Sequence, residues 1–218
     1  MNASQKQNNK VYLMGKIVSR PVFSHELYGE AFYDFKLEVA RLSGQLDILP
    51  ITVSERLLEQ EDTSLGAHIG ISGQFRSYNK ISGDRSRLML TVFAREFLPY
   101  DACGDKTNYI EINGFVCKPP VYRTTPFDRK ICDILLAVNR GYNKSDYIPC
   151  IAWGRNALYV RTVPVGCNLQ IFGRVQSRVY GKRLEDGTVE ERTAYELSVS
   201  KLTKIDPLSE SAATTCDE

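Results

Sequence analysis

Apolar and polar residues alternate along much of this chain, and the clearest alternation covers residues 166–181. Leu169, Ile171 and Val175 recur with a period of two, which places them on one face of a β-strand. Gly173 interrupts the run, and a glycine inside a strand marks a bend or a close backbone approach. The stretch therefore predicts a long curved strand that packs one face into a core and ends in a hairpin.

The same pattern occurs twice, which indicates a tandem duplication of a unit of about 100 residues. The alternative is two unrelated β domains that share common glycine and proline positions. The matched positions lie 99 residues apart and then, after one inserted residue, 100 apart: Gly15 and Gly114, Pro21 and Pro120, Leu37 and Leu136, Pro50 and Pro149, Gly66 and Gly166, Gly73 and Gly173.

Each unit contains five segments rich in β-branched and aromatic residues, with one short helical segment between the third and fourth. Helices are predicted around Glu55 to Gln60 and from Arg155 to Val163. This order is the plan of an OB-fold, so we predict an all-β protein of two tandem OB-fold barrels. The predicted boundaries are 9–98 and 108–206 for the barrels, a polar link over 99–108, and a short disordered tail over 207–218.

Composition narrows the protein class. The chain has 218 residues and a net charge of +2, and its first ten residues are polar. No apolar run approaches the roughly 20 residues that a membrane span needs. The six cysteines are scattered and the two histidines isolated, with no metal-binding or catalytic motif. We therefore expect a cytoplasmic protein that is no enzyme, has no cofactor and no metal, and meets no membrane.

The two units differ in net charge. From Gly114 to Arg183 there are 12 Lys and Arg against 3 Asp and Glu, whereas from Gly15 to Gly83 there are 7 against 9. Local positive charge is what binding to a phosphate backbone requires, since much of the affinity comes from counterion release. A solvated charged face is the ordinary alternative. The asymmetry favours the second unit as the nucleic-acid-binding one.

The second unit resembles the bacterial single-stranded DNA-binding protein family. The resemblance rests on NGFVCKPP, LLAVNRGY, IPCIAWGRNA and GCNLQIFGRVQSRVYG, in that order. It covers nearly all of the second unit and the first more faintly, so the chain looks like a duplicated two-OB form with a short tail. Such a protein binds single-stranded DNA by stacking bases on aromatic side chains.

The resemblance implies four stacking aromatics in the second unit, although strand tyrosines also pack commonly at barrel edges. These residues are Tyr142, Tyr147, Trp153 and Tyr180. Nearby cations are expected on phosphates: Arg140, Lys144, Arg155, Arg174, Arg178, Lys182 and Arg183. The matching positions of the first unit include Ile48 and Ser54, so that unit is expected to be degenerate and mainly architectural.

The resemblance therefore predicts a sequence-tolerant protein that coats and protects single-stranded DNA in replication, recombination or repair, in a bacterial, plasmid or phage setting. Two chains would supply the family's four OB-folds, which predicts a homodimer. Replication or recombination proteins are possible partners, although the chain lacks the family's hydrophobic tail tip. The alternatives are a primosome-like OB-fold adaptor that acts through protein contacts, and an RNA-binding OB protein.

Overall fold

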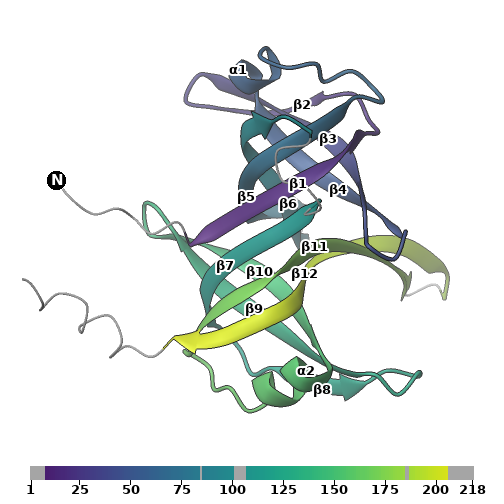
Figure 1. Ribbon diagram of the computed structural model, residues 1–218, viewed down its shortest axis with the longest axis vertical. Helices are drawn as coiled ribbons and strands as arrows, with labels where there is room; N and C mark the ends of the chain where they lie inside the picture. Colours follow the sequence, from purple (N-terminus) through teal and green to yellow (C-terminus); the bar gives the residue numbers. More distant parts are fainter. Residues whose placement is uncertain (1–7, 84, 101–106, 185–186, 206–218) are drawn as a thin grey trace, which may run out of the picture.

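The computed structural model describes residues 8–83, 85–100, 107–184 and 187–205, and it contains two successive sets of strands (Figure 1). The first set is β1 (Asn9–Ile17), β2 (Val22–Leu27), β3 (Glu30–Ala40), β4 (Leu46–Ser54), helix α1 (Glu55–Leu58), β5 (His68–Ser82) and β6 (Arg85–Leu98). The second is β7 (Asn108–Val116), β8 (Val121–Thr124), β9 (Lys130–Arg140), β10 (Lys144–Trp153), helix α2 (Gly154–Val160), β11 (Asn168–Arg183) and β12 (Val189–Ile205). The predicted tail over 207–218 lies outside the described residues.

Each set closes a five-stranded barrel. In the first, β1 pairs with both β5 and β3, and the ring is completed by β5–β6, β6–β4 and β4–β3. The second set repeats this ring with β7, β11, β12, β10 and β9. Only β4–β6 and β10–β12 are parallel among the described pairings. This arrangement, with a short helix between the third and fourth barrel strands, confirms the predicted all-β OB-fold class.

The structure adds one strand to each predicted unit and shortens both helices. Strands β2 and β8 form hairpins with β3 and β9 outside the rings, and β2 is exposed along its whole length, so it lacks the alternation that reveals a strand. Helix α2 ends before the predicted Val163, whose amide instead bonds to Val160 in a tight turn just ahead of Pro164. No helix in the described part of the chain has the length and apolar character of a membrane span.

The alternating residues that suggested the fold form its core. Leu169, Ile171 and Val175 are fully buried. At Gly173 the β11–β12 register shifts by one residue, and a β-carbon there would collide with the carbonyl oxygen of Ser198. The predicted bend is therefore a β-bulge, and its position needs glycine because the two backbones approach too closely for any side chain.

The two barrels are joined into one sheet through β1 and β7, which lie side by side and antiparallel at the centre of Figure 1. The pairing is centred on Val11 opposite Ile110. These two positions are equivalent under the 99-residue offset, so a local twofold axis relates the barrels. The duplicated chain thus forms within itself a pairing that two identical chains could form with each other.

A buried carboxylate fastens the first barrel to the second. Asp47 on β4 is fully buried and accepts hydrogen bonds from the Arg41 guanidinium at 2.6 and 2.7 Å. It also accepts from the backbone N–H of Ser177 on β11 at 2.7 Å and from its hydroxyl at 2.9 Å. Because Ser177 belongs to the other barrel, this buried charge fixes the angle between the barrels.

The twofold mate of this contact is also present. Asp146 on β10 is buried and accepts a 2.8 Å hydrogen bond from the backbone N–H of Ser77 on β5. Arg140 lies 3.3 Å from the same carboxylate. Two equivalent contacts, one on each side of the axis, hold the barrels in a fixed relation and position an arginine at each side of the seam.

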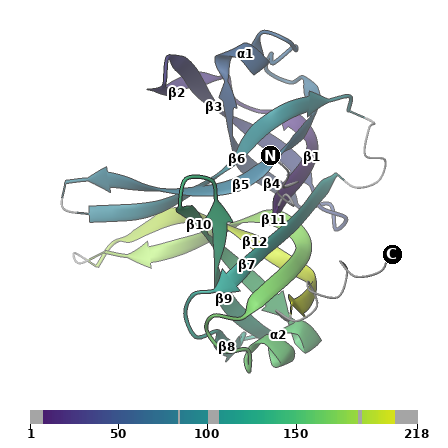
Figure 2. The same ribbon diagram turned by 90° about the vertical axis from the view of Figure 1, so that its left-hand side faces the viewer.

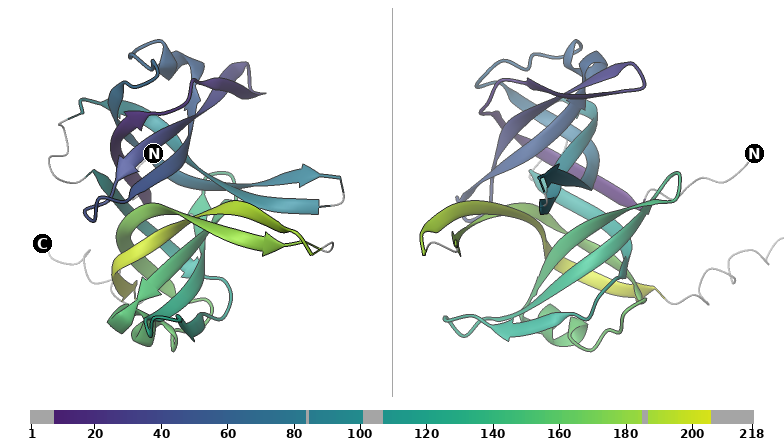
Figure 3. Two further views of the ribbon diagram at one scale, coloured as in Figure 1. Left: turned by 90° about the vertical axis from the view of Figure 1, so that its right-hand side faces the viewer. Right: turned by 180° about the vertical axis from the view of Figure 1, so that it is seen from behind.

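The β5–β6 and β11–β12 hairpins extend well beyond their barrels. Figure 2 and the left view of Figure 3 show the two arms projecting from the same side of the molecule, one from each barrel. The second arm holds a pair opposite in charge, since Lys182 stands across the hairpin from Glu190. The arms lie next to the seam, where the surface cavities of the described residues are found.

Candidate nucleic-acid interface

One groove at the seam is named here the Trp153 groove, with a volume of about 730 Å³. Strands β10, β11 and β12 of the second barrel form its floor, and residues next to the β3–β4 loop of the first barrel form one wall. Its chemistry comes from one indole, four arginines and one carboxylate: Trp153, Arg41, Arg129, Arg174, Arg178 and Glu196.

Trp153 ends β10 at the entrance to α2. Its indole N–H donates a 3.2 Å hydrogen bond to the Ser198 hydroxyl, and the residue is half-buried. The next residue, Gly154, has φ of 53°, a conformation that glycine adopts without strain and that turns the chain from strand into helix. The indole is thus tied by its edge and borders the open groove, as a base-stacking ring must.

The two arginines on β11 are held differently. Arg174 donates to the Gln176 side chain at 3.1 Å, while its Nε is buried and has no hydrogen-bond partner among the described residues. Burial, together with the charge of Arg41, lowers the pKa of Arg174. Arg178 is half-exposed, 3.8 Å from Glu196, with its guanidinium 5.5 Å from the Tyr180 ring centroid. Arg174 therefore has unused donor capacity beside the indole.

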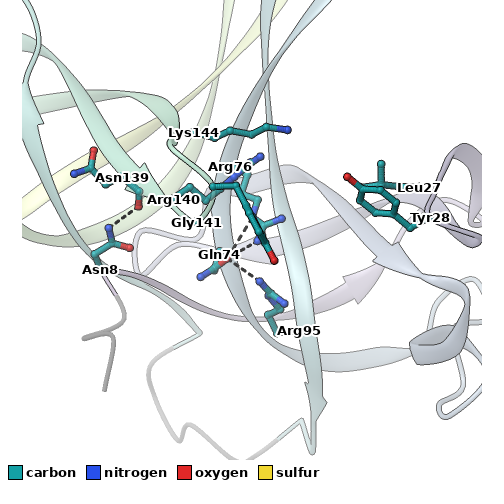
Figure 4. Close-up of a pocket in the computed structure, with 11 residues that line it drawn as sticks. Asn8, Leu27, Tyr28, Gln74, Arg76, Arg95, Asn139, Arg140, Gly141 and Lys144 are labelled. Carbon is teal, nitrogen blue, oxygen red and sulfur yellow. Dashed lines mark hydrogen bonds between the residues drawn. The ribbon is translucent and has the colours of Figure 1, made fainter. Parts of the chain in front are cut away.

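A second groove lies across the local axis and is named here the Tyr142 groove (Figure 4). Its volume is about 1020 Å³. The second barrel contributes the β9–β10 hairpin, and the first contributes the β2–β3 hairpin and the faces of β5 and β6. The lining residues with charged or aromatic side chains are Tyr28, Arg76, Arg95, Arg140, Tyr142 and Lys144.

The predicted site residues fall into three places. Trp153, Arg174 and Arg178 line the Trp153 groove. Arg140, Tyr142 and Lys144 line the Tyr142 groove, where Tyr142 is 99% exposed. The other five lie outside both: Tyr180, Lys182 and Arg183 on the β11 arm, Arg155 in the first turn of α2, and Tyr147, which is 45% exposed and donates its backbone N–H to Ser77.

The sequence reading missed every residue that the first barrel contributes. Arg41 and Arg76 each line a groove, and so do Tyr28 and Arg95. The duplication contained part of this signal, because Arg41 matches Arg140 at the 99-residue offset. The near-neutral charge of the first unit concealed it, since its acidic residues lie largely away from the grooves.

The second barrel matches the model of the single-strand binding protein family over residues 107–205. The second barrel is thus the part of the chain that is similar to the single-strand binding protein family. The matched range includes the indole, the β11 arginines and the β9–β10 hairpin. None of the curated proteins matches the chain.

Solved structures resemble the whole two-barrel arrangement. The wild-type single-stranded DNA binding protein from Thermus aquaticus is 20% identical, with a TM-score of 0.68, over 91% of this chain and 93% of that one. A deletion mutant of the same protein gives the same identity and TM-score over 90% and 94%. At this identity the likeness concerns the fold. The dimeric N-terminal domain of PriB from Thermoanaerobacter tencongensis is 49% identical over 43% of this chain and 99% of that one, with a TM-score of 0.37.

Proposed function

We propose that this protein binds single-stranded DNA without sequence preference, and so coats and protects it during replication, recombination or repair. The observation that supports this most is the Trp153 groove, because it places an accessible indole of the barrel that matches the family among four arginines, three from that barrel and Arg41 from the first. Aromatic rings accept the face of any base and guanidinium groups bind any phosphate, so this chemistry does not select a sequence.

The phosphate contacts are assigned to the arginines and lysines of the second barrel. Arg174 offers a buried Nε with no partner among the described residues, and a phosphate oxygen would satisfy it. Tyr147, Arg155 and the residues on the β11 arm lie outside the grooves and would contact the strand as it leaves them. On this proposal the bound strand stays extended, with its bases on rings, and cannot re-pair.

We also propose that two chains associate, which gives four barrels in one particle. The support is the resemblance to a family that gathers four OB-folds, together with a chain that supplies two. Analytical ultracentrifugation in the absence of DNA should give twice the chain mass. A monomer at micromolar concentration would contradict this part of the proposal.

Titration with oligo-dT tests the function directly, because Trp153 is the only tryptophan in the chain. Binding should quench its fluorescence, oligo-rU and duplex DNA should compete less well, and Trp153→Ala should weaken binding about tenfold, since a stacked base contributes about 1–3 kcal/mol. Tyr159→Ala is the control, an exposed aromatic on α2 that lines neither groove. A wild-type emission that does not respond to DNA would contradict the proposal.

A protein-docking adaptor is the second candidate, favoured by β2. This strand lies at one edge of the sheet, and its Val22 and Phe23 are 65% and 57% exposed. An exposed apolar edge strand can pair with a strand of a partner protein. If oligo-dT does not bind, the adaptor becomes the better account.

A further inference from the structure

On two neighbouring strands of each barrel, an aromatic residue and a serine occupy opposite places in the two barrels. In the second barrel Trp153 ends β10 and donates to Ser198 on β12. The registers of the parallel pairs, Thr52 beside Phe93 and Ile151 beside Ser198, make Phe93 the equivalent of Ser198. The first barrel has Ser54 where the second has Trp153. Its ring has therefore moved one strand sideways, to Phe93 on β6, rather than being lost.

A second exchange accompanies the first on β5 and β11. Gln74 and Arg76 of the first barrel match Arg174 and Gln176 of the second, so the same two residue types stand in reversed order. In both barrels the arginine donates to the glutamine, at 2.7 Å in the first and 3.1 Å in the second. The first barrel thus retains a ring, an arginine and a glutamine on the same outer face.

Phe93 holds two cations over this face. The guanidinium of Arg76 lies 4.2 Å from the ring centroid and that of Arg95 lies 5.3 Å from it. Phe32 supports the ring from the core side at 5.6 Å between centroids. Both arginines also donate to the Gln74 side-chain oxygen, as the dashed lines in Figure 4 show. Cation–π contacts and a shared acceptor therefore hold the two guanidinium groups together.

The charge of this arrangement is not neutralised at the groove. The residues that line the Tyr142 groove include four cations and no carboxylate: Arg76, Arg95, Arg140 and Lys144. Burial and, after it, the charges of Arg95 and Arg140 lower the pKa of Arg76 to about 10, against an opposing effect of Asp146. Asp146 is buried beneath the groove and already bonds to Arg140 and Ser77. An anion that enters the groove would relieve the repulsion between these cations.

Two tyrosines stand at the mouth of the groove in backbone conformations that tyrosine rarely adopts. Tyr28 and Tyr142 have φ of 51° and 60° and are 100% and 99% exposed. Tyr28 and Gly29 form the two-residue turn between β2 and β3, both with positive φ, where Asn-Gly is the favoured pair. A fully exposed tyrosine at such a position lowers stability and contributes nothing to the core, which indicates a use for its ring.

We infer that the first barrel has its own nucleotide site in the Tyr142 groove, in which Arg76 and Arg95 bind a phosphate of single-stranded DNA and Tyr28 and Tyr142 stack its bases. Phe93 is the positioning residue that fixes the two guanidinium groups. This inference rests on the proposed function for the nature of the ligand. It replaces the expected division of labour, since the first barrel then binds DNA as well as supporting the second.

The charge test compares Arg76→Gln/Arg95→Ala with Lys16→Ala/Lys118→Ala, a control that removes two exposed lysines lining neither groove. Binding of a dT oligomer long enough to span both grooves is measured against salt. On single strands the log–log slope is about −0.7 per phosphate neutralised, so losing two contacts should make it shallower by about 1.4. The control should keep the wild-type slope, and quenching of Trp153 at saturation should be unchanged in both variants.

Tyr28→Asn separates binding from folding. Asn-Gly suits the turn better than Tyr-Gly, so the thermal midpoint should hold or rise while affinity for the oligomer falls about tenfold. Wild-type affinity in Tyr28→Asn together with a wild-type salt slope in Arg76→Gln/Arg95→Ala would overturn the inference. If the wild-type protein binds the oligomer and its Trp153 fluorescence is quenched, but these variants behave like the control, only the inference of a first-barrel site is refuted. If the wild type binds no oligomer, the proposed function fails with it.

Discussion

The buried carboxylate at the barrel seam gives the sharpest test of how this fold is held together. Asp47→Asn keeps the size and shape of the side chain but removes its charge. The four hydrogen bonds that Asp47 accepts come from Arg41 and Ser177, at 2.6 to 2.9 Å. An amide can accept through only one of its two terminal atoms, so its NH₂ group would face a donor of Arg41.

The size of the expected loss in the free energy of unfolding follows from how deeply this ion pair is buried. Asp47 is fully buried and the Arg41 side chain is 15% exposed, so the variant leaves an arginine with little access to water and without its counter-charge. Breaking a buried ion pair by removing one partner costs about 3–5 kcal/mol. Urea denaturation at pH 7 should therefore show a loss of that order. The exposed Asp62, which caps a turn by accepting from the Ser64 amide, provides the control Asp62→Asn, which should be close to wild type.

The pH dependence supplies a second readout. Burial by itself raises the pKa of Asp47, but hydrogen bonds from Arg41 and Ser177 outweigh it and hold that pKa below its usual value. A carboxylate with a lowered pKa in the folded state stabilises the protein above its unfolded pKa, near 4, and this stabilisation is lost as the pH falls through the folded pKa. The difference in the free energy of unfolding between wild type and Asp47→Asn should therefore shrink as the pH falls from 7 to 3.

Two results would refute this reasoning. A loss below about 1 kcal/mol would mean that the seam tolerates an uncompensated Arg41, contrary to the cost of burying an unpaired charge. A difference that stays constant from pH 7 to pH 3 would mean that the ionised carboxylate is not what stabilises the contact. Either result would mean that the fixed relation of the barrels depends mainly on the β1–β7 pairing and the Asp146–Ser77 contact.

Two further predictions concern the bulge and the link. Gly173→Ala should lower the thermal midpoint sharply, because the new methyl group meets the Ser198 carbonyl, whereas Gly141→Ala, where a β-carbon meets no atom within 4 Å, should cost much less; equal midpoints would contradict the close approach. A chain cut by a protease within residues 99–108 should still migrate as one particle on size exclusion, because β1–β7 and the two buried carboxylates join the barrels without the link; separation into two fragments would show that these contacts are too weak.

Much of the fold followed from the sequence because its causes are local. Strand residues alternate between a core and water, so Leu169, Ile171 and Val175 identify a barrel wall without knowledge of its partners. The need for glycine at a close backbone approach is equally local, which is why Gly173 marked the bulge. The duplication was visible because two copies of one barrel need the same special residues in the same order.

The candidate site depended on contacts that no local pattern contains. The β1–β7 pairing brings Arg41 of the first barrel to the groove of Trp153, and the two are 112 positions apart in the chain. When the two units are aligned, the first lacks a ring at the position of the second unit's stacking ring, because Ser54 occupies the position of Trp153. Only the parallel pairing of β4 with β6 shows that Phe93 lies on the neighbouring strand, since register between distant strands is set by tertiary packing. The sequence by itself therefore determined which residues form the barrels and which chemistry they present. The tertiary structure decided which of them meet, because both grooves lie at a seam that exists only after the two barrels have folded and paired.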